Sequence, residues 1–230
     1  MKIWLNIVCT LFLLCQSGLA QSFVNLNFEQ STIVTSTPSG EGFNYGIANV
    51  SGWTEYYGYG DSNYSGGMTV AYNDPTLDLA GVSLVDTSLP WPAIQGMYSI
   101  LLYGGTSIPE DGTNGAAIGQ MGRIPFSTRS ITYWSNGGPL QVTFNGQILP
   151  SIALSSTPNY TIFGADISAY VGKTGELLFT APWPADGGEY DILDNIQFSS
   201  SPIPEPGTFS LYALGGLLFG LGSLRKLISN

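Results

Sequence analysis

The sequence has no histidine, few basic residues and no cysteine after position 15. Its 230 residues include six Lys and Arg against 16 Asp and Glu, for a formal net charge of -10. Without His there is no Ser-His-Asp triad and no His-ligated zinc or haem. So few cations cannot replace the counterions of a nucleic acid, and we expect no nucleic-acid partner. Because Cys9 and Cys15 lie within the first 20 residues, the rest of the chain has no disulfide, thiolate metal site or Cys nucleophile.

The first 20 residues have the pattern of a secretory signal peptide. Lys2 precedes the apolar run Ile3–Leu14, which is shorter than the roughly 20 residues of a membrane span. Gly18-Leu19-Ala20 then places small residues before a cleavage site between Ala20 and Gln21. The sequence therefore predicts export with removal of residues 1–20, and a retained N-terminal anchor is the alternative.

A second apolar segment lies near the C-terminus. Residues 201–208 form a linker with Pro204-Glu205-Pro206, residues 209–224 are uncharged and apolar, and residues 225–230 start with Arg225-Lys226. At about 1.5 Å per residue the apolar run covers roughly 24 Å as a helix. We expect a transmembrane helix with its basic end, residues 225–230, in the cytoplasm.

This tail resembles the PEP-CTERM sorting signal of Gram-negative bacteria, also labelled an ice-binding-protein C-terminal domain. The resemblance rests on Pro204, Glu205, Pro206, the apolar run and the pair Arg225-Lys226. It implies recognition by an exosortase, a membrane protease that cuts near the Pro-Glu-Pro motif. The protein would be membrane-anchored before this processing and would then be released or attached at the cell surface. A plain tail anchor with a chance motif is the alternative.

The region between the two ends, residues 21–200, predicts one all-β domain. It is rich in Gly and Pro and consists of short alternating or β-branched runs without a helical period. We expect strands at Phe23–Phe28, Met68–Tyr72, Val82–Val85, Tyr98–Tyr103, Ala116–Met121, Ser130–Trp134, Leu140–Phe144, Gln147–Ile152, Asn159–Phe163, Leu177–Thr180 and Ile192–Phe198. Asn145-Gly146 predicts a hairpin turn. The expected fold is a two-sheet antiparallel sandwich of jelly-roll type, with a signal helix and a C-terminal transmembrane helix at its ends.

The order of local patterns resembles the jelly-roll carbohydrate-binding modules of secreted glycanases. Six stretches carry the resemblance: Asn25-Leu26-Asn27-Phe28-Glu29, Gly52-Trp53-Thr54, Gly96-Met97-Tyr98-Ser99-Ile100-Leu101-Leu102, Ile118-Gly119-Gln120, Ser130-Ile131-Thr132-Tyr133-Trp134 and Asp194-Asn195-Ile196. The resemblance implies the sandwich fold. It does not identify a ligand, because jelly rolls host many functions.

A Gly-rich stretch with many aromatic residues is the candidate glycan site. Sugars stack their C–H faces on aromatic rings, and nearby Asp and Asn side chains bind hydroxyl groups. We therefore predict a glycan-binding platform at Trp53, Tyr56, Tyr57 and Tyr59. Residues 21–201 contain 15 acidic and three basic residues, so a neutral polysaccharide is the expected ligand. The alternative is that these rings cover one end of the sandwich and fill its core.

A structural calcium site is expected near the last strand. Asp186, Glu189, Asp191 and Asp194 form an acidic run there, and calcium binds six to eight oxygens. The related modules often join the Glu of the first strand to the Asp of the last strand through calcium, which implies Glu29 and Asp194 as ligands here. A solvated acidic loop is the alternative.

These observations predict an exported protein of the cell surface or extracellular matrix. We expect a non-catalytic binding or structural module associated with glycans, sorted by an exosortase-type membrane protease. The alternatives are a glycan-cleaving enzyme that uses paired carboxylates and a purely structural surface protein without a specific ligand.

Overall fold

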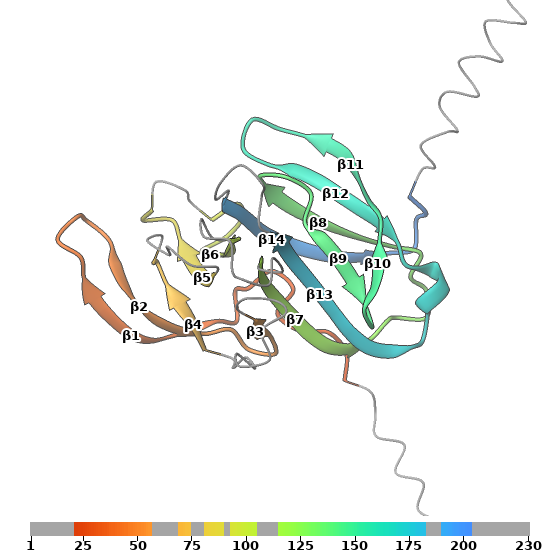
Figure 1. Ribbon diagram of the computed structural model, residues 1–230, viewed down its shortest axis with the longest axis horizontal. Coiled ribbons are helices and arrows are strands. Elements are labelled where there is room, and N and C mark those ends of the chain that lie inside the picture. Colours follow the sequence, from red (N-terminus) through yellow and green to blue (C-terminus); the bar gives the residue numbers. More distant parts are fainter. Residues whose placement is uncertain are drawn as a thin grey trace, which may run out of the picture.

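The described strands form two sheets that face each other (Figure 1). The computed structural model describes residues 21–56, 69–74, 81–89, 93–104, 115–182 and 190–203. Within these residues the regular structure is β-strand, apart from a 3-10 turn at Ser168–Tyr170. The expected all-β sandwich is therefore confirmed.

The larger sheet has nine strands in the order β1-β2-β4-β5-β6-β14-β8-β12-β11. Their bounds are Thr32–Pro38 (β1), Asn44–Asn49 (β2), Thr69–Tyr72 (β4), Gly81–Asp86 (β5), Tyr98–Tyr103 (β6), Tyr190–Ser199 (β14), Ser130–Asn136 (β8), Thr161–Asp166 (β12) and Ser151–Ser156 (β11). The expectation of a fully antiparallel sandwich is wrong at one place, because β4 and β5 pair in parallel, with Ala71 opposite Ser83.

The smaller sheet has five strands in the order β10-β9-β13-β7-β3. Their bounds are Gln147–Leu149 (β10), Gln141–Phe144 (β9), Thr174–Pro182 (β13), Gly115–Arg123 (β7) and Thr54–Tyr56 (β3). The predicted hairpin at Asn145-Gly146 is confirmed between β9 and β10, with φ of 49° and 73° at its two residues.

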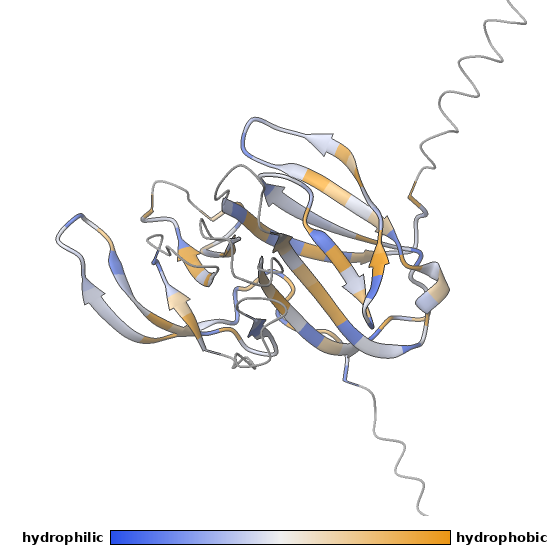
Figure 2. Ribbon diagram, in the orientation of Figure 1, coloured by the Kyte–Doolittle hydropathy of each residue, from blue (hydrophilic) through white to orange (hydrophobic). Residues whose placement is uncertain are grey.

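Aromatic side chains from both sheets and from the N-terminal segment meet in the core. The Phe179 ring lies 6.3 Å from the Trp53 ring and 5.4 Å from the Tyr133 ring, measured between centroids. The Phe28 ring also packs against Trp53, with 5.5 Å between the centroids. Hydrophobic residues are prominent along β13 in Figure 2. In the absence of disulfides, this apolar burial is the main source of stability.

The segment before β1 is not the strand that its apolar alternation predicts. Asn25 and Phe28 have φ of 50° and 59°, and such left-handed residues turn the chain. Val24 is held instead by the Gln120 side chain, whose Oε1 accepts from Val24 N at 2.6 Å and whose Nε2 donates to Val24 O at 3.0 Å. The predicted strand at Phe23–Phe28 is therefore wrong, and Glu29 lies in a turn.

The other predicted strands are confirmed with shifted bounds. The largest change is at Gln147–Ile152, which divides at Pro150 into β10 of the smaller sheet and β11 of the larger one. Proline lacks the N–H that a continuous ladder needs, which explains the division. Strands β1, β2 and β3 were not predicted.

The two expected terminal helices lie outside the described residues, as do Ala20, Pro204, Glu205, Pro206, Arg225 and Lys226. In the part of the chain that the structure describes, no helix is long and apolar enough to cross a membrane.

Candidate functional site

Trp53 and Tyr56, the two predicted glycan-binding residues that the structure describes, point to different sides of the smaller sheet. Trp53 is 1% exposed, and its indole Nε1 donates to Asn25 O at 3.0 Å. It therefore lies in the core, and its predicted role as a sugar platform is wrong, because neither face of the ring is open to a ligand. Tyr57 and Tyr59 lie outside the described residues.

Tyr56 lies on the opposite side of β3 from the core. Side chains alternate along a strand, so Thr54 and Tyr56 point away from the core when the flanking Trp53 points into it. Tyr56 is opposite Ala117 of β7. A Cβ built on the neighbouring Gly119 would lie 3.2 Å from Tyr56 Cε2, so the tyrosine ring reaches over this glycine.

Tyr56 is tied to an acidic residue on β13. Its hydroxyl donates to Glu176 Oε1 at 2.6 Å. Burial, together with this hydrogen bond and the carboxylate charge, raises the pKa of Tyr56 to about 12. The phenol therefore remains a donor over the physiological pH range.

The backbone of Glu176 is fixed by the hairpin turn between β9 and β10. Asn145 Oδ1 accepts from Glu176 N at 3.1 Å, and Asn145 N donates to Glu176 O at 2.9 Å. The carboxylate is thus held on rigid elements and faces Tyr56 across the glycine of β7.

We call this side of the smaller sheet the outer face. It comprises Tyr56, Gly119, Met121, Thr143, Glu176 and Leu178, whose sequence neighbours Ile118, Leu177 and Phe144 belong to the core. Leu178 is 4% exposed and Met121 is 61% exposed. The outer face therefore combines an aromatic ring, apolar side chains and a carboxylate around a residue without a side chain.

This combination suits a neutral sugar. Met121 is exposed and Tyr56 and Glu176 are half-buried, whereas Leu178 is buried. The tyrosine ring and the methionine can pack against C–H groups, and the carboxylate can fix the orientation. A carboxylate has about four acceptor positions. Tyr56 occupies one of those on Glu176, which leaves capacity to accept from sugar hydroxyls.

The alternation of core and non-core residues along β13 predicts part of the outer face from the sequence. Leu177 and Phe179 are core residues, so Glu176 and Leu178 fall on the other side. The position of Glu176 beside Tyr56 depends on the pairing of β13 with β7 and of β7 with β3, which no local pattern predicts.

The second candidate site joins Glu29, the segment 94–98 and the start of the bulge in β14. Asp194 Oδ2 accepts from Gln95 N at 2.9 Å and from Ser99 Oγ at 2.8 Å. Glu29 Oε1 accepts from Met97 N at 2.9 Å and from Tyr98 N at 3.1 Å. The two carboxylates are thus held by the same short segment.

Asp194 is fully buried. Burial raises its pKa to about 6, and the negative charge of Glu29 contributes in the same direction, although the hydrogen bonds from Ser99, Gln95 and Asn195 oppose the change. The raised pKa means that removing this carboxyl from water outweighs its hydrogen bonds.

The groups around Asp194 fit a calcium ion poorly. The described partners of both carboxylates are N–H and O–H donors, whereas calcium needs oxygen ligands. Among the residues that the structure describes, no three His, Cys, Asp or Glu side chains come together as a metal site. Asp186 and Glu189 of the acidic run lie outside those residues. Calcium at Glu29 and Asp194 stays a prediction.

No family model matches the sequence, and no curated protein matches it. One similar solved structure is that of the carbohydrate-binding module TmCBM61 in complex with beta-1,4-galactotriose. Its TM-score is 0.40 at 14% sequence identity, over 78% of this chain and 97% of that chain. At this TM-score the likeness says nothing about the site of this chain.

Proposed function

We propose that this chain is an exported surface protein whose β-sandwich binds a neutral glycan on the outer face without cleaving it. The observation that carries the proposal is the arrangement of Tyr56 over Gly119 with its hydroxyl on Glu176. The ring offers a stacking surface and the carboxylate offers acceptors, both on paired strands rather than on loops. Rigid elements hold such groups in place at low entropic cost.

The charge of the domain supports a neutral ligand. Residues 21–201 contain 15 acidic and three basic residues, and this excess repels anionic polymers. Glu176 adds a negative charge to the outer face itself, which disfavours uronic acids there. Neutral hexose polymers meet no such barrier.

Cleavage by Asp86 or Asp166, two of the described carboxylates, is disfavoured by their structural roles. Asp86 accepts from Ser88 and from Tyr72 Oη, and Asp166 accepts from Ser168 N at 2.7 Å. These contacts stabilise turns and strand ends. A glycosidase needs one carboxylate to protonate the leaving group and another to act on the sugar. Glycan cleavage is the alternative function, and the release of sugar fragments would reveal it.

Export and sorting are part of the proposal. The signal-like residues 1–20 and the tail with Pro204-Glu205-Pro206, the apolar run 209–224 and Arg225-Lys226 support them. Export would remove the first segment, and an exosortase would cut near the Pro-Glu-Pro motif. The protein would then stay at the cell surface or in the extracellular matrix.

A glycan array tests the binding function. The protein is screened against neutral polysaccharides, including β-1,4-galactan, together with the variants Tyr56→Ala and Glu176→Gln. We expect binding that Tyr56→Ala reduces at least tenfold. Tyr45→Ala is the matched control, since Tyr45 is 45% exposed on β2 of the other sheet.

Three results would contradict the proposal. Release of sugar fragments would indicate the enzyme. Equal binding by wild type and Tyr56→Ala would move the site away from the outer face. Absence of binding to any glycan would favour the purely structural surface protein.

Mass spectrometry of the protein from cells with an active exosortase tests the sorting. We expect a mature chain that starts at Gln21 and ends near Pro204-Glu205-Pro206. A mature chain that keeps residues 209–230 would contradict sorting and indicate a tail anchor.

A further inference from the structure

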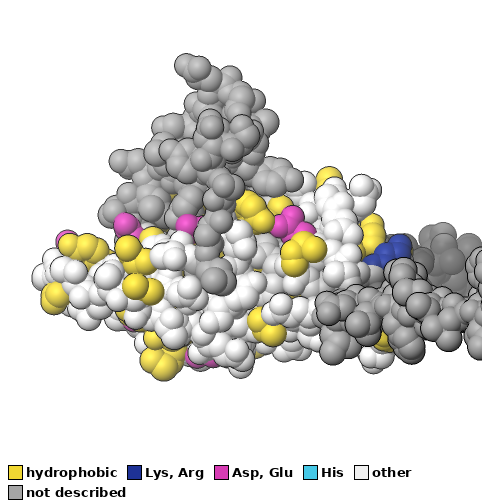
Figure 3. Space-filling view, turned by 90° about the horizontal axis from the view of Figure 1, so that it is seen from below, with side chains coloured by type: hydrophobic (Ala, Val, Ile, Leu, Met, Phe, Trp, Pro, Cys, Tyr) yellow, Lys and Arg dark blue, Asp and Glu magenta, His cyan; other side chains and the backbone are white. Residues whose placement is uncertain are grey.

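The basic residues of the domain lie together at one end. Arg123, Arg129 and Lys173 are the Lys and Arg residues between positions 21 and 203. Arg123 Nε donates to Gly172 O at 3.0 Å, and Ile124 N donates to Lys173 O at 3.0 Å. The loop 124–129 is therefore fixed against the turn before β13. In Figure 3 the visible Lys and Arg side chains lie at one end of the molecule.

An exposed aromatic ring lies among these cations. Phe126 is 72% exposed, and the guanidinium of Arg123 lies 4.4 Å from its ring centroid. Gly172, with φ of 72°, lets the ring approach, because a Cβ there would lie 2.6 Å from Phe126 Cε1. Aromatic rings flanked by Lys and Arg are typical of surfaces that enter the interface of a bilayer.

Both ends of the described domain leave the sandwich next to the cations. Arg123 N donates to Gln21 O at 3.0 Å, and Arg129 N donates to Ser199 O at 2.7 Å. The chain after residue 203 continues into the uncharged apolar run 209–224. When that run lies in a membrane, this end of the domain is tethered close to the lipid headgroups.

We propose that this basic end, formed by Arg123, Phe126, Arg129 and Lys173, docks on anionic phospholipid headgroups while the C-terminal segment holds the chain in the membrane. The inference rests on the proposed role of the tail. Basic residues at a bilayer are attracted to anionic lipids. The acidic remainder of the domain is repelled, so the contact selects one orientation.

This contact with the headgroups is too weak to bind a free domain, but it is sufficient to orient a domain that is already tethered. Tethering gives the surface an effective concentration in the millimolar range, so three cations and one ring can orient the domain. Asp166 also lies at this end and accepts from Ser168 N at 2.7 Å. Glu176 lies opposite Met121, two residues from Arg123 along β7. The three cations exceed these two carboxylates.

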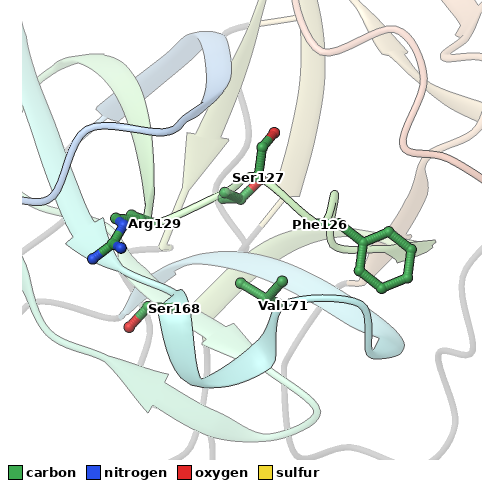
Figure 4. Close-up of a pocket in the computed structure, with 6 residues that line it drawn as sticks. Phe126, Ser127, Arg129, Ser168 and Val171 are labelled. Carbon is green, nitrogen blue, oxygen red and sulfur yellow. The ribbon is translucent and has the colours of Figure 1, made fainter.

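A pocket between the ring and one of the cations provides space for a headgroup. It has a volume of about 380 Å³ and is lined by Phe126, Ser127, Thr128, Arg129, Ser168 and Val171. In Figure 4 the Phe126 ring and the Arg129 guanidinium point away from each other on either side of Ser127. Hydroxyl and guanidinium donors next to an apolar ring match the phosphate and the upper acyl region of a phospholipid.

The test measures orientation in vesicles with the full chain. Cys9 and Cys15 are replaced by Ser, and one environment-sensitive fluorophore is attached through Ser127→Cys, or through Val34→Cys as the control. Val34 is 59% exposed on β1, and β1 lies at the far end of the long axis from the 3-10 turn (Figure 1). The vesicles contain phosphatidylcholine alone or with about one third phosphatidylglycerol.

We expect quenching by iodide to fall at least threefold at position 127 in the anionic vesicles, with no change at position 34. The protection should disappear in the double variant Arg129→Gln/Lys173→Gln and in 0.5 M salt, which screens the charges. It should persist in Arg129→Lys/Lys173→Arg, which keeps both charges. Phe126→Ala should reduce it.

Flotation with neutral vesicles separates this inference from the tail anchor. A chain that floats with neutral vesicles but shows no lipid-dependent difference between positions 127 and 34 overturns the docking and leaves the anchor. A chain that floats only with anionic vesicles and is protected at position 127 supports the docking without the anchor. Flotation with neither overturns both.

Loss of alginate binding in the double variant, with unchanged protection on vesicles, would assign the basic end to an anionic polysaccharide and overturn the docking.

Discussion

The carboxyl group of Asp194 connects protonation to folding. Burial raises its pKa from the ordinary value of 3.8 to about 6 in the folded protein. The protonated form therefore favours folding, and this contribution is complete below pH 4 and is lost as the pH rises through 6. We expect the free energy of unfolding to be larger at pH 5 than at pH 8, by roughly 1 to 1.5 kcal/mol from this group. Urea unfolding at both pH values measures the difference.

Asp194→Asn is the control for this pH dependence, because it removes the titrating group and keeps the shape. The difference between pH 5 and pH 8 should shrink by about the same 1 to 1.5 kcal/mol. An unchanged difference in the variant would assign the effect to the other carboxylates of this acidic domain.

Calcium gives an independent test at the same residue. If calcium binds at Glu29 and Asp194, the unfolding midpoint at pH 8 should be higher in millimolar calcium than in a chelator. The substitution Asp194→Asn should abolish this shift. The shift would be smaller at pH 5, where the proton competes for Asp194. The N–H and O–H donors that hold these carboxylates would compete with calcium for the same oxygens, and an unchanged midpoint at pH 8 would contradict the predicted site.

Trp53 stabilises the fold and should not affect glycan binding directly. Since it is 1% exposed and its Nε1 donates to Asn25 O, we expect Trp53→Ala to lower the free energy of unfolding by about 3 to 5 kcal/mol. Trp53→Phe should cost less and retain glycan binding. A folded Trp53→Phe variant that loses binding while Tyr56→Ala retains it would contradict our assignment of the two residues.

At the scale of elements, the position of the segment 94–98 depends on the close approach of Gly96 to the Glu29 carboxylate. Gly96 has φ of 68°, and a Cβ there would collide with Glu29 Oε1. Gly96→Ala should cost about 2 to 4 kcal/mol, which combines the left-handed backbone with the displacement of Glu29. Thermal or urea unfolding measures the loss.

Gly40→Ala is the matched control for this prediction. Gly40 has φ of 84° and nothing within 4 Å of its built Cβ, so only the backbone cost of about 1 to 2 kcal/mol applies. The excess at Gly96 should vanish in a Glu29→Ala background. Equal costs at the two glycines would show that Glu29 does not hold the segment.

The strands that local pattern predicts are those with a buried, alternating or continuous apolar face. β6 and β13 are examples, with Ile100 and Phe179 in the core. β1 was not predicted because it is mostly exposed and consists of Thr, Ser and Pro with a few apolar residues. The segment Phe23–Phe28 was predicted as a strand because apolar and polar residues alternate along it. Left-handed φ values at Asn25 and Phe28 turn the chain there instead.

The candidate site was predicted in part for a similar reason. The sequence identifies Tyr56 among several aromatic residues, but it does not distinguish Tyr56 from Trp53. The alternation of β3 and the hydrogen bond of Trp53 to Asn25 make that distinction. Glu176 joins the site only through strand pairing across 120 positions.

At the scale of the whole molecule, the larger sheet depends on its last strand. β14 lies between β6 and β8 and contributes Leu193 and Ile196 to the core. A chain that ends at residue 189 should therefore fail to fold, with loss of the near-ultraviolet circular dichroism of the aromatic core. A chain that ends at residue 203 retains β14 and should give the full signal. A cooperative unfolding transition in the shorter chain would contradict this view.

The central position of β14 also sets the order of events for a chain that crosses a membrane N-terminus first. β6 and β8 emerge well before β14, and each keeps an unpaired edge that can recruit other chains. The sheet can close only when Ser199 has emerged, and under the proposed export the apolar run 209–224 would by then lie in the translocation channel. An arrest at that run would give the domain time to close its sheet beside the membrane, before it diffuses among other newly exported copies. The tail would thus act as a folding checkpoint as well as an address.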